Sequence, residues 1–199
     1  MTVLAATAWP TNAHMIEAVH ELGYIRDDDF VLDPTYGNGK WWTRYRPTLF
    51  CTSDLNPDKG SITEDFTDLH WRDAAFDVVA FDPPYKLNGT ATESVDEPYG
   101  VEKYASWRDR VTLIERGMVE CHRVLKPRGI LLLKCQDQVS GGKVRWQTHH
   151  FASYGRGLLR MMLEDELHML GGRPQPEGRR QLHARRNMST LLVFRKGKA

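Results

Sequence analysis

The chain has 199 residues, of which 41% are hydrophobic, and a chain of this size can bury the core of one domain. We therefore expect residues 1–199 to form a single domain. Its 27 lysines and arginines nearly balance 26 acids, for a net charge of +1. The chain therefore lacks the large positive net charge typical of many nucleic-acid-binding proteins, so any basic surface must be local.

The three cysteines, Cys51, Cys121 and Cys135, stand far apart and form no CxxC motif, which argues against a zinc site and against a disulfide framework. We expect them to be reduced and the protein to be cytoplasmic. No histidine stands at metal-ligand spacing beside other ligands, so we expect no metal. The sequence shows neither a signal peptide nor an apolar run long enough for a membrane span, so we expect no membrane association. These features leave the oligomeric state open.

Helices and strands are predicted to alternate in the first half of the chain. Apolar residues at helical spacing predict a helix over residues 10–24, with Gly23 as its stop. Pro47 limits any helix that begins near Trp41 to about two turns. Short apolar runs predict strands over 30–32, 48–53 and 76–81, and a weaker strand over 61–63. A polar stretch without a period, residues 86–105, predicts a long loop, and such loops often carry function.

The second half continues the alternation. Apolar positions spaced by three and four predict a helix over 107–125, and the apolar run over 130–133 predicts a central strand covered on both faces. A polar turn over 136–143 is expected next, followed by a helix over 146–154 and strands over 158–170 and 190–194. The pattern as a whole predicts a doubly wound α/β sheet.

The strand over 76–81 leads into Asp82, Pro83, Pro84 and Tyr85. The two prolines end the strand, because neither has an N–H to donate to a ladder. The Asp82 carboxylate is therefore expected at the sheet edge where α/β proteins bind ligands. Together with the Pro83 carbonyl and the flat Tyr85 ring, it suits a planar group that bears an amine, such as a nucleobase. The alternative is a proline turn that merely ends a strand.

The first strand ends on Asp33 and leads into a glycine loop, Pro34-Thr35-Tyr36-Gly37-Asn38-Gly39. Glycines allow the backbone to approach a ligand closely. Trp42 stands where a dinucleotide site would have its third glycine, and the loop lacks the GK[ST] of a phosphate-binding loop. An acid before this loop fits a cationic ligand, one with an ammonium or a sulfonium.

Acids also follow the second and third strands. Asp54 is placed to bind the two hydroxyls of a ribose, and Asp65 with Phe66 could receive and stack an adenine. A single Asp is more often simply solvated, but the acids at 33, 54, 65 and 82 fall at strand ends in order. The adjacent Trp41 and Trp42 are expected to pack in the core.

Together these motifs resemble the class I methyltransferases that use S-adenosylmethionine, and within them the DPPY-type amino-methyltransferases of nucleic acids. DPTYGNG resembles their cofactor loop, FDPPY their catalytic tetrapeptide, and RVLKPRG the turn before their fifth strand. The resemblance implies a Rossmann-like sheet, mostly parallel with an antiparallel C-terminal strand, and S-adenosylmethionine as cofactor. It implies catalytic roles for Asp82, Pro83, Pro84 and Tyr85, and cofactor binding by Asp33, Thr35, Tyr36, Gly37, Gly39, Asp54, Leu55, Asp65 and Phe66.

The resemblance also favours adenine N6 in DNA as the methyl acceptor, because the cytosine enzymes more often begin the tetrapeptide with Ser. Two segments, 86–105 and 171–188, are expected to contact the substrate. The second carries arginines expected to contact phosphates, namely Arg173, Arg179, Arg180, Arg185 and Arg186, although a solvated basic loop is the simpler interpretation of each. An enzyme that methylates adenine N6 or guanine N2 in rRNA or tRNA is the alternative. A non-catalytic methyltransferase-like binding subunit is a third hypothesis.

Overall fold

The computed structural model describes residues 4–5, 9–87, 106–171, 182–184 and 186–198. Seven strands form one sheet in the order β3-β2-β1-β4-β5-β9-β8. Their bounds are β1 Phe30–Asp33, β2 Leu49–Asp54, β3 Ile62–Thr63, β4 Phe76–Phe81, β5 Leu125–Cys135, β8 Met162–Leu170 and β9 Met188–Arg195. The helices are α1 Asn12–Glu21, α2 Trp107–Val124, α3 Gln147–Gly157 and the short 3-10 helix η1 Lys40–Trp42.

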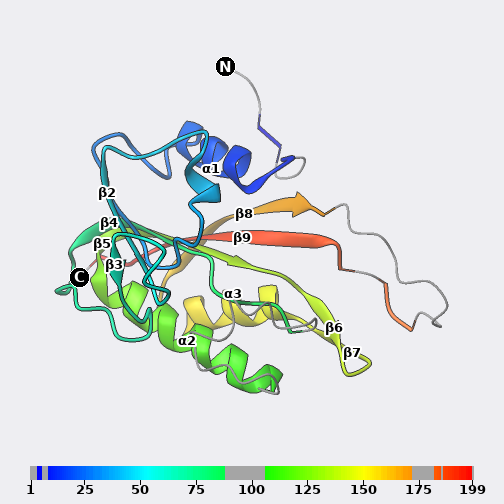
Figure 1. The fold of residues 1–199 in the computed structure, drawn as a ribbon. Coiled ribbons are helices and arrows are strands. Elements are labelled where there is room, and N and C mark those ends of the chain that lie inside the picture. Colours follow the sequence, from blue (N-terminus) through cyan, green and yellow to red (C-terminus); the bar gives the residue numbers. More distant parts are fainter. Residues whose placement is uncertain (1–3, 6–8, 88–105, 172–181, 185, 199) are drawn as a thin grey trace.

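Strands β3, β2, β1, β4 and β5 pair in parallel. Strand β9 runs antiparallel between β5 and β8. Helix α1 covers one face of the sheet, and α2 and α3 cover the other (Figure 1). The predicted doubly wound, mostly parallel sheet with an antiparallel C-terminal strand is therefore confirmed.

The core has two layers because the central strands are apolar on both faces. Successive strand residues point to opposite faces, so Leu32 and Leu133 pack with α2 and α3, whereas Val31 and Leu132 pack with α1. Trp41 and Trp42 are buried in the α1 layer. Their predicted core role is confirmed.

Helices α1 and α2 begin at polar caps. The Thr11 hydroxyl accepts the His14 N–H at the start of α1, and Gly23, with φ of 78°, follows its last turn. Ser106 and Asp109 form a capping box at the start of α2. These local signals explain why both helices start near their predicted positions.

Three predicted boundaries are wrong. The expected polar turn over 136–143 contains a β-hairpin, β6 Gln138–Ser140 and β7 Lys143–Arg145, which turns on Gly141 and Gly142 with φ of 57° and 71°. The strand expected from residue 158 begins at Met162, because α3 continues to Gly157. Strand β5 already starts at Leu125, and the expected turn over 126–129 is an irregularity in its register with β4.

Among the residues that the structure describes, no helix is long and apolar enough to cross a membrane. Residues 88–105, 172–181 and 185 lie outside the described residues. The expected substrate contacts of the 86–105 loop therefore stay predictions, as do those of Arg173, Arg179, Arg180 and Arg185.

Candidate active site

The two sequence motifs meet where the strand order reverses, between β1 and β4. Asp33 is the last residue of β1, and Asp82 directly follows β4, so both lie at the carboxyl ends of neighbouring parallel strands. The Thr35 hydroxyl joins them: it accepts the Asp82 backbone N–H at 2.8 Å and donates to Asp33 Oδ1 at 3.3 Å. The glycine loop and the DPPY turn are thus parts of one site, in the crevice where open α/β sheets bind ligands.

Asp33 is a buried carboxylate, with 4% of its surface exposed. It accepts hydrogen bonds from the Thr35 N–H at 2.9 Å and from the Trp42 indole N–H at 2.7 Å. Burial raises its pKa to about 7, and the nearby charge of Asp82 adds to the rise, although the bonds from Trp42 and Thr35 lower it. A cation beside this carboxylate would favour its charged form.

The glycine loop is held against the end of β2. The Gly37 N–H donates to Asp54 Oδ2 at 2.8 Å, and the Tyr36 N–H donates to the Ser53 carbonyl at 3.1 Å. Gly39 has a φ of 64°, and a Cβ there would lie 2.5 Å from the Tyr36 hydroxyl oxygen. Both the conformation and the space therefore require glycine at position 39.

Only the three residues of η1 are helical after this loop, although a helix of up to two turns was compatible with the sequence. A single 3-10 turn has no helix dipole to offer a ligand. The loop backbone and the carboxylates of Asp33 and Asp54 are therefore the groups that this region can offer to a ligand.

Asp54 is buried at the end of β2, where the sequence predicts ribose binding. Besides the Gly37 N–H, its carboxylate accepts the Asn56 N–H at 2.9 Å. Each carboxylate oxygen has further lone pairs, so these contacts leave room for ligand hydroxyls. Leu55, the next residue, is partly exposed.

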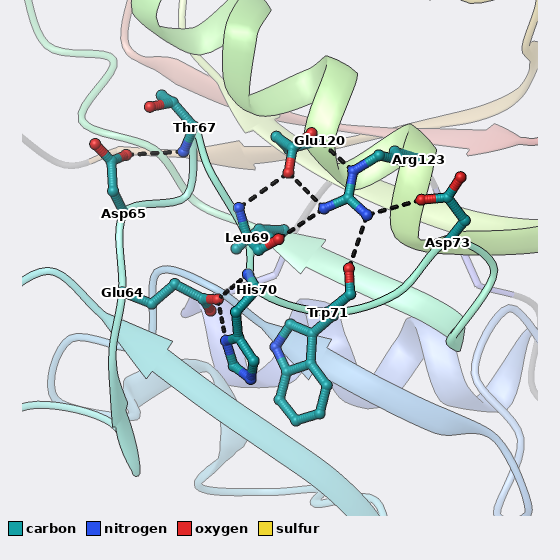
Figure 2. A network of polar contacts seen from close by, with 9 residues as sticks. All are labelled: Glu64, Asp65, Thr67, Leu69, His70, Trp71, Asp73, Glu120 and Arg123. Carbon is teal, nitrogen blue, oxygen red and sulfur yellow. Dashed lines mark hydrogen bonds and ion pairs between the residues drawn. The ribbon is translucent and has the colours of Figure 1, made fainter.

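The adenine site predicted after β3 requires one correction. Asp65 is exposed, and it accepts the Thr67 N–H at 2.8 Å (Figure 2). Phe66 is completely buried and packs against Phe81, with ring centroids 5.1 Å apart, and against Gly117 of α2. The Phe66 ring has no exposed face for a base, so its role is in the core.

A network of hydrogen bonds and ion pairs connects the segment after β3 to α2 (Figure 2). Arg123 donates to the carbonyls of Leu69 and Trp71, each at 2.7 Å. The Glu120 carboxylate accepts the Leu69 N–H at 2.9 Å and also pairs with Arg123. These bonds fix the position of the segment that carries Asp65. The sequence offers no signal for them, because the partners lie about 50 residues apart.

The DPPY turn is held by its backbone. The Tyr85 N–H donates to the Pro83 carbonyl at 2.7 Å, which closes a three-residue turn. The Arg110 guanidinium donates to the Pro84 carbonyl at 2.9 Å. The Pro83 oxygen keeps a second lone pair, with which it can accept a ligand amine.

Two glutamine side chains hold the far end of this turn. The amides of Gln138 and Gln147 both donate to the Tyr85 carbonyl, at 2.8 and 3.1 Å. Gln147 also donates to the Gln136 carbonyl at 2.6 Å. The sequence pattern gave no indication of these contacts, because Gln136 and Gln138 fall in the predicted polar turn.

A buried lysine also acts on Asp82. Lys134 has 2% of its surface exposed and lies on β5, beside β4. Its ammonium donates to Asn12 Oδ1 and lies 5.7 Å from the Trp41 ring centroid. The sequence contains one signal of this residue, a lysine that interrupts the apolar run of a central strand.

Burial raises the pKa of Asp82, whereas the charges of Lys134 and Lys86 lower it. The Trp41 indole N–H also lowers it, although this N–H makes no hydrogen bond of ordinary length. Conversely, burial lowers the pKa of Lys134 and the Asp82 charge raises it. Lys134 therefore favours the charged form of Asp82.

Other expectations are tested only in part. Arg186 is the one predicted phosphate-binding arginine within the described residues, and its guanidinium lies 4.4 Å from the Trp146 ring centroid. No cluster of three or more His, Cys, Asp or Glu side chains that could hold a metal ion occurs in the described ranges. The expectation of a metal-free protein stays a prediction.

No family model and no curated protein sequence matches the chain. Solved structures do match it. A candidate methyltransferase from Bacillus halodurans is 13% identical, with a TM-score of 0.60 over 92% of this chain and 99% of its own. A structure described as SAM-dependent methyltransferases from Methanosarcina mazei is 12% identical, with a TM-score of 0.53 over 97% of this chain and 100% of its own. The chain has the α/β Rossmann-like methyltransferase fold.

A candidate DNA modification methylase from Thermus thermophilus also matches, at 18% identity and a TM-score of 0.44, over 65% of this chain. The chain spans about half the length of that protein, 48%. At these identities the likeness concerns the fold, and the reaction must be argued from the site itself.

Proposed function

We propose that this protein transfers a methyl group from S-adenosylmethionine to the exocyclic amine of a nucleobase, and that the acceptor is adenine N6 in DNA. The observation that carries the proposal is the Thr35 hydroxyl, which bonds both Asp33 and the Asp82 backbone. It joins a candidate site for a cationic cofactor to a candidate site for an amine.

The residues around Asp33 fit the proposed cofactor. Asp33 is a buried acid, and no ion pair joins it to a cation among the residues that the structure describes. The ammonium of S-adenosylmethionine can provide that positive charge. Gly37 and Gly39 allow the backbone to approach the ligand, and Asp54 can accept ribose hydrogens. Asp65 can accept the adenine amino group. When bound, the cofactor would supply an electrophilic methyl on its sulfonium.

The DPPY turn has the groups that activate an aromatic amine. The lone pair of such an amine is delocalised into the ring, so the nitrogen is a poor nucleophile. If the Asp82 carboxylate and the Pro83 carbonyl each accept one amino hydrogen, the nitrogen moves toward tetrahedral geometry and its lone pair is localised. Positioning and preorganised acceptors would therefore provide most of the rate.

Tyr85 is partly exposed beside these acceptors. Stacking of a base on an aromatic ring contributes about 1–3 kcal/mol, comparable to the few kcal/mol needed to extrude a base from a duplex. The ring therefore offsets the cost of bringing the target base to Asp82.

The direct test offers radiolabelled S-adenosylmethionine with duplex DNA, single-stranded DNA, rRNA and tRNA. Label in DNA at N6-methyladenine supports the proposal. Label confined to RNA would establish the alternative RNA methyltransferase, and calorimetry that detects no cofactor binding would favour a non-catalytic subunit.

The variant Asp82→Ala separates chemistry from cofactor binding. We expect it to lose about 10²–10³-fold in turnover, as when one preorganised hydrogen-bonding group is removed from a transition state. Cofactor affinity should be retained when it is measured near pH 8, where Asp33 is mostly charged with or without the Asp82 charge. Asp28→Ala, which removes an exposed acid, should behave as wild type. Normal turnover by Asp82→Ala would refute the mechanism.

A further inference from the structure

The hairpin β6–β7 leads directly to an exposed aromatic residue, Trp146, which the proposed transfer reaction does not use. Trp146 has 51% of its surface exposed, so it is not part of the core. The guanidinium of Arg186 lies over its ring, 4.4 Å from the centroid. The combination of an exposed indole with a stacked arginine is typical of surfaces that bind the bases of single-stranded nucleic acids.

The surroundings of this indole are basic. Lys143 is exposed and Arg145 partly exposed on β7, immediately before Trp146. The Arg145 guanidinium lies 4.3 Å from the Trp107 ring centroid, and its buried Nε has no hydrogen-bond partner. The acid nearest in the chain, Asp137, accepts the Thr148 N–H at 2.8 Å. Lys143 and Arg145 thus lie within three residues of Trp146 in the chain, and Arg186 lies over its ring.

Hydrogen bonds connect the same surface to the catalytic turn. Gln147, the residue after Trp146, is buried and donates to the carbonyls of both Tyr85 and Gln136. The Gln136 amide in turn donates to the Arg186 carbonyl at 3.0 Å. Trp146 and Arg186 are therefore held in a fixed relation to the turn that carries Tyr85.

We propose that Trp146 stacks on an unpaired base beside the target nucleotide, while Lys143, Arg145 and Arg186 contact the phosphates of the same strand. The identity of the target nucleotide rests on the proposed function, but the stacking surface does not. Every base has a π face, so this contact requires no particular sequence. It does require a base outside the duplex stack, so we expect single strands to bind more tightly than duplexes of the same sequence.

The first test measures binding of a short fluorescein-labelled deoxyoligonucleotide to the full chain by anisotropy, with single-stranded and duplex forms compared. Trp146→Ala should weaken single-strand binding about 5- to 150-fold, the range expected for the loss of one stacked base. Trp146→Phe should retain most of the affinity. The matched control is Leu158→Ala, which removes an exposed apolar side chain at the other end of α3 and should change nothing.

Salt dependence tests the phosphate contacts. Log affinity falls as log salt concentration rises, and Lys143→Gln should make this slope less steep by about 1. Arg156→Gln, an exposed cation near the end of α3, should leave the slope unchanged. Wild-type binding by Trp146→Ala, or equal losses in Leu158→Ala and Trp146→Ala, would overturn the inference.

Turnover distinguishes this inference from the proposed function. If the protein methylates the oligonucleotide, Trp146→Ala should raise the KM for the oligonucleotide and leave the KM for the cofactor unchanged. If it methylates no nucleic acid while binding still depends on Trp146, the proposed function fails and the stacking surface stands. Methylation with an unchanged KM in Trp146→Ala would refute the stacking surface alone.

Discussion

The buried carboxylate of Asp33 predicts that cofactor affinity depends on pH. Its pKa of about 7 in the protein means that about nine tenths of the molecules carry a neutral Asp33 at pH 6 and about one tenth at pH 8. If the cofactor ammonium binds only the charged form, the apparent Kd rises by the reciprocal of the charged fraction. The cofactor amine is itself only about half charged at pH 8, so the dissociation constant should be about fivefold higher at pH 6 than at pH 8, which corresponds to about 1 kcal/mol.

The direction in which cofactor affinity changes with pH follows from the direction of the Asp33 pKa shift. Burial raises the pKa of Asp33, so the proton must leave before the cation binds, and affinity increases as the pH rises through about 7. Calorimetry with S-adenosylmethionine in two buffers of different ionisation enthalpy should detect proton release at about pH 6. The cofactor's own amine loses its charge near pH 8, so the titration should stop there.

The variant Asp33→Asn is the decisive control for this prediction. It should bind the cofactor weakly and should lack the increase in affinity above about pH 6, because its side chain does not titrate. A urea denaturation curve would show whether the variant is folded, since the amide cannot accept both hydrogen bonds equally well. The reasoning would be refuted if wild-type cofactor affinity were constant over this pH range. It would also be refuted if the affinity of Asp33→Asn changed with pH as much as that of the wild type.

Two further predictions concern Asp82 and the core. Lys134→Met should shift the acidic limb of the kcat/KM pH profile to higher pH, because Lys134 lowers the pKa of Asp82 while burial raises it. Lys198→Met, which removes an exposed lysine, serves as the control, and an unchanged profile in Lys134→Met would exclude the coupling. Gly117→Ala should reduce the free energy of unfolding in urea by about 1–3 kcal/mol, since its Cβ would lie 2.5 Å from the Phe81 ring. Gly157→Ala, where a Cβ meets nothing within 4 Å, should not destabilise the protein, and equal losses in both variants would contradict the packing argument.

The sheet and its ligand edge could be predicted because their signals are local. Pro83 and Pro84 end β4 by removing two backbone donors, and Gly37 and Gly39 mark the loop after β1. Asp33 and Asp82 are thereby placed at the same edge once the strands are taken as parallel neighbours. The sequence did not reveal that Thr35 bonds both segments, because that contact depends on how close β1 and β4 lie.

The errors arise where distant residues decide the outcome. Phe66 follows an acid at a strand end, as a base-stacking residue would, but the missing side chain of Gly117 leaves space into which its ring packs. The hairpin β6–β7 has strands of three residues with few apolar side chains, so its pattern resembled a turn. Its identity as a hairpin depends on the Gly141-Gly142 turn and on backbone pairing.

The charges at the sheet edge predict that the proposed cofactor and acceptor bind cooperatively. Asp33, Asp82 and Lys134 belong to the neighbouring strands β1, β4 and β5 or follow them directly. Lys134 offsets the charge of Asp82, whereas the charge of Asp82 raises the pKa of Asp33. A cationic cofactor beside Asp33 would supply the missing positive charge, and its field would also favour the charged form of Asp82. Because the charged carboxylate is the better acceptor for an amine, cofactor binding should tighten acceptor binding, and by linkage the acceptor should tighten cofactor binding by the same factor. This coupling makes the two binding steps cooperative whichever ligand binds first.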